Sequence, residues 1–405
     1  MVGAARSDKA VLLFSLYLAQ GLPFGFFTLA LPVILRDAGL SLTQISLLGL
    51  LALPWALKFL WAPVVDQRGS SRSWLLALQT ATILAALALI PLDPGTSFAL
   101  LLAAAFAFNL LAATQDIVTD GLAVRLLGPA ERGIGNGLQV GAYRLGMILG
   151  GGALLWIFAR YGWSVAFAGM AALLALTLLP VLRLDEAQRR APPVAASGAA
   201  LALGWLTRAR QPQMLTAAAL IVAYRFGDQM VSSLFGPFLL DQGLDLETIA
   251  LMKGTVGSTT SLAGAVLGGA FVFSVGRRLA LLASGLAQAA CFLLYIAAAA
   301  GMGGVPLLWG ATIVEGIVST MATVALFTLM MDAADPDHAG TDYTLLASVV
   351  VLVGTVAGIA GGVVADALGY TATFVLGTLL AAGGCLAVIG WLDRRPTRRL
   401  AEVWR

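Results

Sequence analysis

The chain of 405 residues is far more apolar than a water-soluble domain: 60% of its residues are hydrophobic and 11% are charged, where soluble proteins carry roughly 25% charged residues. The net charge of +3 comes from basic residues that flank apolar runs, so no nucleic-acid partner is expected. The length accommodates about twelve membrane helices of roughly 20 residues each. We therefore expect an integral membrane protein.

The N-terminus predicts an uncleaved first helix. Arg6 and Lys9 precede an apolar run, 11–35, which is long enough to span a membrane and too long for a signal peptide. The two cysteines, Cys291 and Cys385, fall inside separate apolar runs, so neither a disulfide nor a metal pair is expected. No phosphate-binding loop, nucleophile elbow or dinucleotide fingerprint occurs, and no cofactor is expected.

Apolar runs separated by polar, glycine or proline residues predict an all-α membrane protein with twelve transmembrane helices. The predicted spans are 11–35, 44–65, 73–92, 97–124, 134–159, 162–182, 213–240, 247–274, 278–300, 305–331, 343–366 and 369–392.

The distribution of basic residues predicts the orientation. Eighteen of the 24 lysines and arginines fall in the segments that share one side with the N-terminus, and two fall in the opposite loops. Because cytoplasmic loops are enriched in basic residues, both termini are expected in the cytoplasm.

The longest polar interruption divides the chain into two halves. Residues 183–212 are rich in arginine, proline and small residues and indicate a cytoplasmic linker, with a surface helix expected near 201–206. We expect an N-terminal six-helix bundle over 1–182 and a C-terminal six-helix bundle over 213–405.

The two halves also resemble each other. The run 32–45 recurs as 237–249, and the run 161–167 recurs as 368–374, each about half the chain apart. Two related six-helix bundles of this kind place a substrate site between them, near the middle of the membrane.

Asp116 and Asp120 lie four residues apart on one face of the fourth span. A charge in hydrocarbon is costly unless it is paired or faces water, and a carboxyl group in such surroundings resists ionisation. Both residues are therefore candidates for proton coupling. The alternatives are a static ion pair between helices and, for Asp120, exposure to the cytoplasm.

Two Tyr-Arg pairs lie in the fifth and seventh spans, one in each half. They are Tyr143-Arg144 and Tyr224-Arg225, the second followed by Asp228. A guanidinium binds carboxylates or phosphates through two hydrogen bonds, so these residues are candidates for binding an anionic substrate. Asp228 can pair with Arg225 and is a further candidate for proton coupling. Alternatively, each arginine only neutralises a buried acid.

Three further ionisable residues fall within predicted spans. Lys253 is expected to contact substrate or to line an outer vestibule, and Glu315 is a proton-coupling candidate or a helix-pairing residue. Lys58 is expected near the cytoplasmic gate, unless it extends to the membrane surface.

The turn between the second and third spans suggests a gate. Asp66 is followed by Arg68 and Arg72, a pattern that resembles the cytoplasmic gate motif of major facilitator proteins. The resemblance implies that the acid holds the two halves closed on the cytoplasmic side. His338, the only histidine, falls in a loop with several aspartates. We expect that loop to be solvated rather than to bind a metal.

In combination these motifs resemble the AmpG-related permeases of the major facilitator superfamily. The family includes muropeptide permeases, acetyl-CoA transporters and siderophore permeases of the RhtX/FptX type. Two runs, 24–27 and 120–125, resemble the siderophore permeases more than the other branches of the family. The runs that carry the resemblance are 20–23, 58–66, 114–117, 131–133, 143–147 and 224–228.

The resemblance implies the major facilitator fold. It also implies proton-driven import of a medium-sized polar or anionic solute across the bacterial inner membrane by alternating access. The leading candidate is a siderophore, and the alternative is an anhydro-muropeptide. The sequence is also compatible with a membrane-embedded acyltransferase, a non-transporting sensor, and an exporter or flippase of the same fold. The expected partners are the solute, protons and lipid, and the protein is expected to act as a monomer and not as an enzyme.

Overall fold

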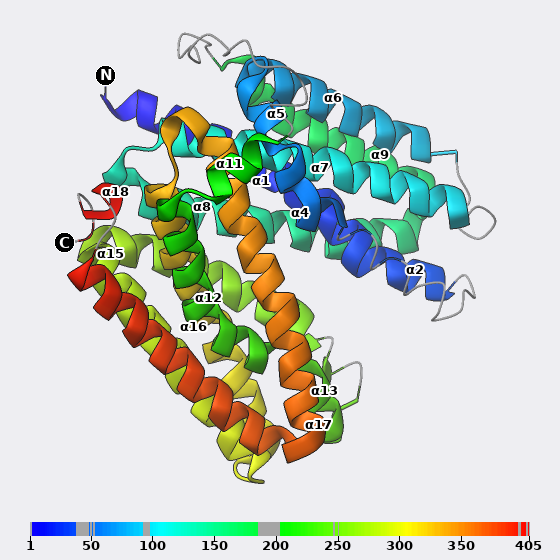
Figure 1. Ribbon diagram of the computed structural model, residues 1–405. Helices are drawn as coiled ribbons and strands as arrows, with labels where there is room; N and C mark the ends of the chain where they lie inside the picture. Colours follow the sequence, from blue (N-terminus) through cyan, green and yellow to red (C-terminus); the bar gives the residue numbers. More distant parts are fainter. Residues whose placement is uncertain are drawn as a thin grey trace. The chain divides into compact units, whose positions relative to one another are not determined.

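The computed structural model describes residues 2–37, 48, 51, 53–91, 98–184, 203–245, 248–249, 251–395, 398–401 and 404. All regular secondary structure within these ranges is helical (Figure 1). The chain forms two compact units. Unit 1 comprises 1–126, 142–208 and 335–344, and unit 2 comprises 127–141, 209–334 and 345–405.

Unit 1 holds most of the first half of the chain. Its helices are α1 (Val2–Gly25), η1 (Phe26–Ala30), α2 (Leu31–Asp37), α4 (Leu53–Leu57), η3 (Lys58–Leu60), α5 (Ala62–Gln67), α6 (Ser71–Leu89), α7 (Phe98–Leu126), η5 (Leu149–Ala153), α9 (Leu154–Leu182) and η7 (Pro336–His338), with α11 (Gly204–Ala209) at its end.

Unit 2 holds most of the second half. Its helices are η4 (Pro129–Glu131), α12 (Pro212–Ser232), α13 (Phe235–Asp241), η6 (Leu251–Val256), α15 (Gly257–Ala299), α16 (Gly304–Ala333) and α18 (Arg398–Ala401). Two helices belong to both units: α8 (Arg132–Ile148) starts in unit 2, and α17 (Ala339–Arg394) starts in unit 1.

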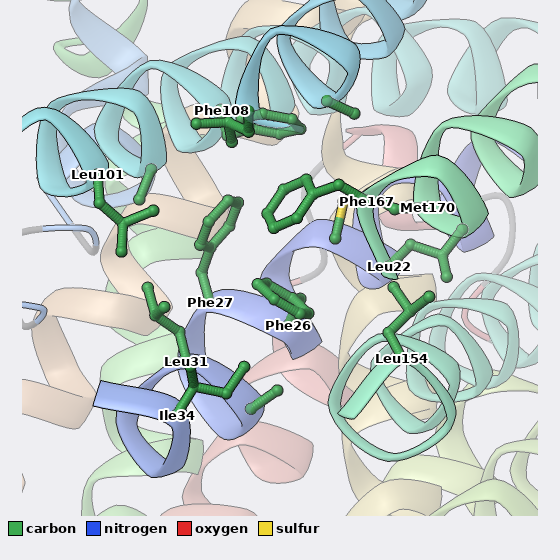
Figure 2. Close-up of a cluster of buried hydrophobic side chains, with 14 of the residues drawn as sticks. Leu22, Phe26, Phe27, Leu31, Ile34, Leu101, Phe108, Leu154, Phe167 and Met170 are labelled. Carbon is green, nitrogen blue, oxygen red and sulfur yellow. The ribbon is translucent and has the colours of Figure 1, made fainter. Parts of the chain in front are cut away.

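An aromatic core packs η1, α7 and α9 of unit 1 together (Figure 2). The Phe26 and Phe167 rings lie 5.1 Å apart edge to face, and the Phe27 and Phe108 rings lie 5.2 Å apart. All four side chains are fully buried. In a membrane such contacts stabilise the unit through close packing rather than through expulsion of water.

The start of unit 1 also depends on backbone contact between α1 and the α8–η5 segment. A Cβ atom at Gly150 would lie 1.9 Å from the carbonyl oxygen of Leu22, and one at Gly21 would lie 2.2 Å from that of Tyr143. Only glycine permits this approach. Both segments continue into π-helical turns, η1 and η5, and these turns pack together.

The expectation of a continuous helix over 44–65 is wrong for the described residues. From residue 53 onward this segment is broken into α4, η3 and α5. Pro54 and Pro63 lie in these pieces, and proline removes a backbone donor that a continuous helix needs. The rest of the predicted span, 44–52, lies largely outside the described residues.

Seven helical stretches in the described part of the chain are long and apolar enough to cross a membrane. Three of them contain a glycine with positive φ: Gly162 (84°), Gly276 (81°) and Gly369 (81°). These breaks coincide with the boundaries between predicted spans five and six, eight and nine, and eleven and twelve. The total of twelve spans and the side of the termini stay predictions.

The backbone supports the internal repeat. Gly162 and Gly369, and likewise Gly69 and Gly276, adopt positive φ at positions 207 residues apart. The first of these pairs lies within the repeated runs 161–167 and 368–374. The other repeat, 32–45, extends into residues outside the described ranges. The surface helix expected near 201–206 is α11, which begins at Gly204.

We predict that Gly150→Ala lowers the stability of the protein by about 1–3 kcal/mol, because the new methyl group overlaps the Leu22 carbonyl. Thermal unfolding of detergent-purified protein measures the change. Gly152→Ala is the matched control, since nothing lies within 4 Å of a Cβ at that position. Equal midpoints for the two variants would contradict close α1–η5 packing.

Candidate functional site

The described part of unit 1 contains a buried ion pair between Lys58 and Asp116. Lys58 opens η3 and Asp116 lies on α7; their exposed fractions are 5% and 8%. Lys58 Nζ also lies 5.6 Å from the ring centre of Trp55. Lys58 therefore does not extend to the membrane surface. The broken helix around η3 brings its ammonium group to the carboxylate.

Asp120 lies one turn beyond Asp116 and is 1% exposed. The Tyr17 hydroxyl donates a hydrogen bond of 2.9 Å to its Oδ1 atom. Gln20, one turn along α1, donates from Nε2 to the Thr119 hydroxyl at 3.2 Å, and its Oε1 atom has no partner in the described part of the chain. The alternative that Asp120 is exposed to the cytoplasm is thus wrong, and a polar layer joins α1 to α7.

Tyr143 and Arg144 lie on the unit 1 part of α8. The Phe24 ring is 5.7 Å from Tyr143 and 5.8 Å from Trp55, so these three rings form one aromatic group next to Lys58. Arg144 is half-buried and makes no ion pair or hydrogen bond with any residue that the structure describes. Such a guanidinium is free to bind an anion.

Unit 2 has a polar cluster of its own, on α12. Arg225 Nη1 lies 2.7 Å from Asp228 Oδ2, as the i,i+3 spacing predicts. Gln288 on α15 donates to Asp228 Oδ1 at 2.9 Å. A cavity of about 10 Å³, the size of one water molecule, adjoins this cluster. Tyr224 lines it, but its hydroxyl donates to the Leu281 carbonyl at 3.1 Å.

Lys253 and Glu315 interact electrostatically. Lys253 lies in the π-helical turn η6, and its Nζ atom is 5.8 Å from the ring centre of Phe235. Glu315 on α16 is half-buried. Its charge neighbour Lys253 comes from another helix, η6.

Asp66 binds the first turn of α17. Its Oδ2 atom accepts hydrogen bonds from the backbone N–H and the hydroxyl of Thr341, at 3.0 and 3.1 Å. Arg125 Nη1 lies 3.4 Å from Oδ1. The first N–H groups of a helix have no partner within the helix, and a carboxylate there is stabilising. Asp66 thus caps α17 from α5.

The two predicted gate arginines have different positions. Arg72 Nη2 donates to the carbonyl oxygen of Leu182, the last residue of α9, at 3.1 Å, where a cation complements the helix end. Arg68 is exposed, and its carbonyl oxygen accepts a hydrogen bond from the Trp74 indole at 2.6 Å.

The expectation of a solvated acidic loop around His338 is wrong for two of its aspartates. In unit 2, Asp332 is buried between Arg132 (2.7 Å) and Arg277 (3.0 Å). In unit 1, Asp342 is fully buried and pairs with Arg208 of α11. Burial opposes the charge of Arg208, but the hydrogen bonds to Asp342 outweigh it and raise the Arg208 pKa above its ordinary value.

His338 itself is half-buried, and its Nδ1 atom lies 3.0 Å from Gln67 Nε2. Within the residues that the structure describes, no three His, Cys, Asp or Glu side chains are grouped so as to hold a metal ion.

Sequence reasoning missed several of these residues. Tyr17 and Gln20 are polar residues three apart in an apolar span, a spacing that places both on one helix face and gives a signal for them. Gln288 has no such signal, because it approaches Asp228 from a distant helix. The charged residues missed are Arg125, Arg132, Arg208, Asp332 and Asp342, all close to ends of predicted spans.

We predict that Lys58→Met and Asp116→Asn each destabilise the protein by about 3–5 kcal/mol, because each leaves one buried group unpaired. The double variant is expected to recover most of the loss. Thermal unfolding of the three purified variants forms a double-mutant cycle. Additive losses in the double variant would contradict a buried pair.

The chain matches known proteins over most of its length. The sequence profile of the Major Facilitator Superfamily matches residues 13–358 and, in a second match, 222–403. The chain is 27% identical over 391 residues to the anhydromuropeptide permease of Escherichia coli K12, covering 95% of this chain and 80% of that protein. It is 22% identical over 401 residues to a putative transporter, AmpG 4, of Rickettsia felis, covering 95% and 96%.

Solved structures show the same fold. The human organic anion transporter MFSD10 matches with a TM-score of 0.74 at 17% identity, covering 94% of this chain and 99% of that one. FucP in its outward conformation matches with a TM-score of 0.73 at 16% identity, covering 96% and 99%. The chain therefore belongs to the Major Facilitator Superfamily, and it is a multi-pass protein of the bacterial inner membrane. Within the superfamily, its relatives support an AmpG-related permease.

Proposed function

We propose that this secondary transporter imports an anhydro-muropeptide, a sugar–peptide that carries carboxylates, together with protons and by alternating access. The observation that carries the proposal is Arg144, a half-buried guanidinium on an apolar helix without an ion pair among the described residues. A charge in such a place is a candidate functional site by default. The substrate class is supported by relatives named for anhydromuropeptide or AmpG.

The substrate chemistry follows from the side chains around Arg144. Its guanidinium would bind a substrate carboxylate, and the rings of Tyr143, Phe24 and Trp55 offer apolar faces for a sugar. Arg225 in unit 2 is the second candidate for binding the substrate anion. The substrate would compete with Asp228, which already pairs with this guanidinium. Lys253 and Glu315 form a further pair that a charged solute could separate.

The proton-coupling proposal assigns different roles to the two acids of α7. Asp116 is neutralised by Lys58. Asp120 is held by the Tyr17 hydroxyl in a buried polar layer, where a carboxyl group gains and loses a proton according to the charges around it. We propose Asp120 as the proton carrier and the Lys58–Asp116 pair as the charge that responds to it.

A ferric siderophore is the competing substrate, because the runs 24–27 and 120–125 resemble that branch of the family. The relatives reported above are named for anhydromuropeptide or AmpG instead. Proteoliposomes with an inward proton gradient and radiolabelled substrate separate the two. We expect accumulation of the anhydro-muropeptide and not of the ferric siderophore; the reverse result would overturn the substrate assignment.

We predict that Arg144→Gln raises the KM for uptake by about 10- to 100-fold, as expected for loss of a hydrogen bond to a charged group. Initial rates in the same proteoliposomes measure it. Arg160→Gln is the matched control, because Arg160 is exposed and makes no ion pair or hydrogen bond with a described residue. An unchanged KM in Arg144→Gln would remove Arg144 from the site.

We predict that Asp120→Asn abolishes proton-driven accumulation but retains substrate exchange at equal concentrations on both sides, since exchange needs no net proton movement. Both are measured with labelled substrate in proteoliposomes. Asp241→Asn serves as the control, because Asp241 is exposed. Normal accumulation by Asp120→Asn would show that another group carries the proton.

A further inference from the structure

The short helix α11 lies in the segment that joins the two predicted halves, and it contacts unit 1 at two places. Trp205 packs edge to face on Phe59 of η3, with ring centres 5.2 Å apart. A Cβ atom at Gly204 would lie 3.2 Å from the Cβ of Pro63 in α5. The helix is thus packed against the broken segment that also carries Lys58.

The second contact is a two-point ion pair with α17. Arg208 Nε donates to Asp342 Oδ1 at 2.7 Å, and Nη2 donates to Oδ2 at 2.5 Å. The Asp342 side chain is fully buried and that of Arg208 is 13% exposed. Asp335 Oδ2 lies 3.6 Å from the same guanidinium. Pairs of this geometry are among the strongest in proteins, and loss of one partner leaves a buried charge.

Asp342 lies close to the point where α17 passes from unit 1 to unit 2. It lies in the first turn of α17, next to Thr341, which Asp66 holds from α5. Residues 335–344 belong to unit 1, whereas the same helix continues from residue 345 as part of unit 2. The start of α17 is therefore bound by two elements of unit 1, α5 and α11, while the remainder of the helix belongs to unit 2.

We propose that α11 is a second cytoplasmic latch, in which Arg208 binds Asp342 when the transporter is closed to the cytoplasm and releases it when the transporter opens. The segment that joins the halves is then part of the gate rather than a passive tether. The latch supplements the Asp66 cap, which acts on the neighbouring residue of the same turn. The inference rests on alternating access as proposed above, but not on the identity of the substrate.

A purely static role for the pair predicts a different outcome. If Arg208 only anchored the linker, its loss would lower stability without changing the balance between the open and closed states. A latch shifts that balance, because a ligand or contact present in one state favours that state by its differential energy. The population of the two states is therefore the decisive readout.

The experiment measures distances between spin labels on the two units, without substrate. Ala130→Cys and Arg183→Cys place the labels at exposed positions of unit 2 and unit 1, both predicted to be cytoplasmic, and the native cysteines are buried. In the Arg208→Gln background we expect a larger population at long distance. Arg210→Gln is the matched control, being exposed and without an ion pair or hydrogen bond to a described residue.

Two more variants exclude a folding artefact. Asp342→Asn should give the same shift as Arg208→Gln, and the charge exchange Arg208→Asp with Asp342→Arg should restore much of the short-distance population. The apparent KM for outside substrate should rise several-fold in the single variants, because fewer molecules are open to the outside. Distance distributions for Arg208→Gln and Asp342→Asn identical to those of Arg210→Gln would overturn the latch, even if transport of any tested substrate is absent.

Discussion

A charge in an apolar interior must find a partner or face water, and this constraint accounts for the polar contacts that organise both units. Lys58 reaches Asp116 only because its helix is broken at η3. Asp228 is held by Arg225 on its own helix and by Gln288 on another. Arg144 is the exception among the described residues, and that is why it carries the functional proposal.

Each unit has an ion pair near the end of a long helix, and the acid and the arginine exchange places between the two units. Arg125 and Asp332 are 207 residues apart and occupy equivalent positions near the ends of α7 and α16. In unit 1 the acid, Asp66, lies near the end of α5, and Arg125 lies on α7. In unit 2 Arg277 comes from the turn and Asp332 from the helix. The two equivalent helix ends thus both carry an ion pair, but the helix contributes the arginine in unit 1 and the acid in unit 2.

Much of the fold can be predicted from the sequence, because few backbone conformations are stable in lipid. Long apolar runs must be helices, since their backbone groups have no water to bind, and Gly162, Gly276 and Gly369 mark breaks where polar punctuation predicts them. The break at η3 does not follow from sequence, because prolines such as Pro54 and Pro63 are tolerated in many membrane helices.

The partners of the buried acids cannot be read from the chain. Lys58 and Asp116 are separated by 58 residues, and Arg208 and Asp342 by 134, so only the packing of helices brings them together. The acidic composition around Asp342 indicates a solvated loop, but its burial depends on an arginine from another element. Gln288 likewise cannot be identified from the sequence, because its partner Asp228 lies on another helix.

The account depends on buried carboxyl groups of unit 1 exchanging protons as substrate moves. The most direct measurement is the external pH of lightly buffered proteoliposomes when anhydro-muropeptide is added without an imposed gradient. The account predicts that substrate entry makes the medium more alkaline, and that Asp120→Asn removes this signal while substrate binding persists. Substrate entry with no change in external pH would contradict it.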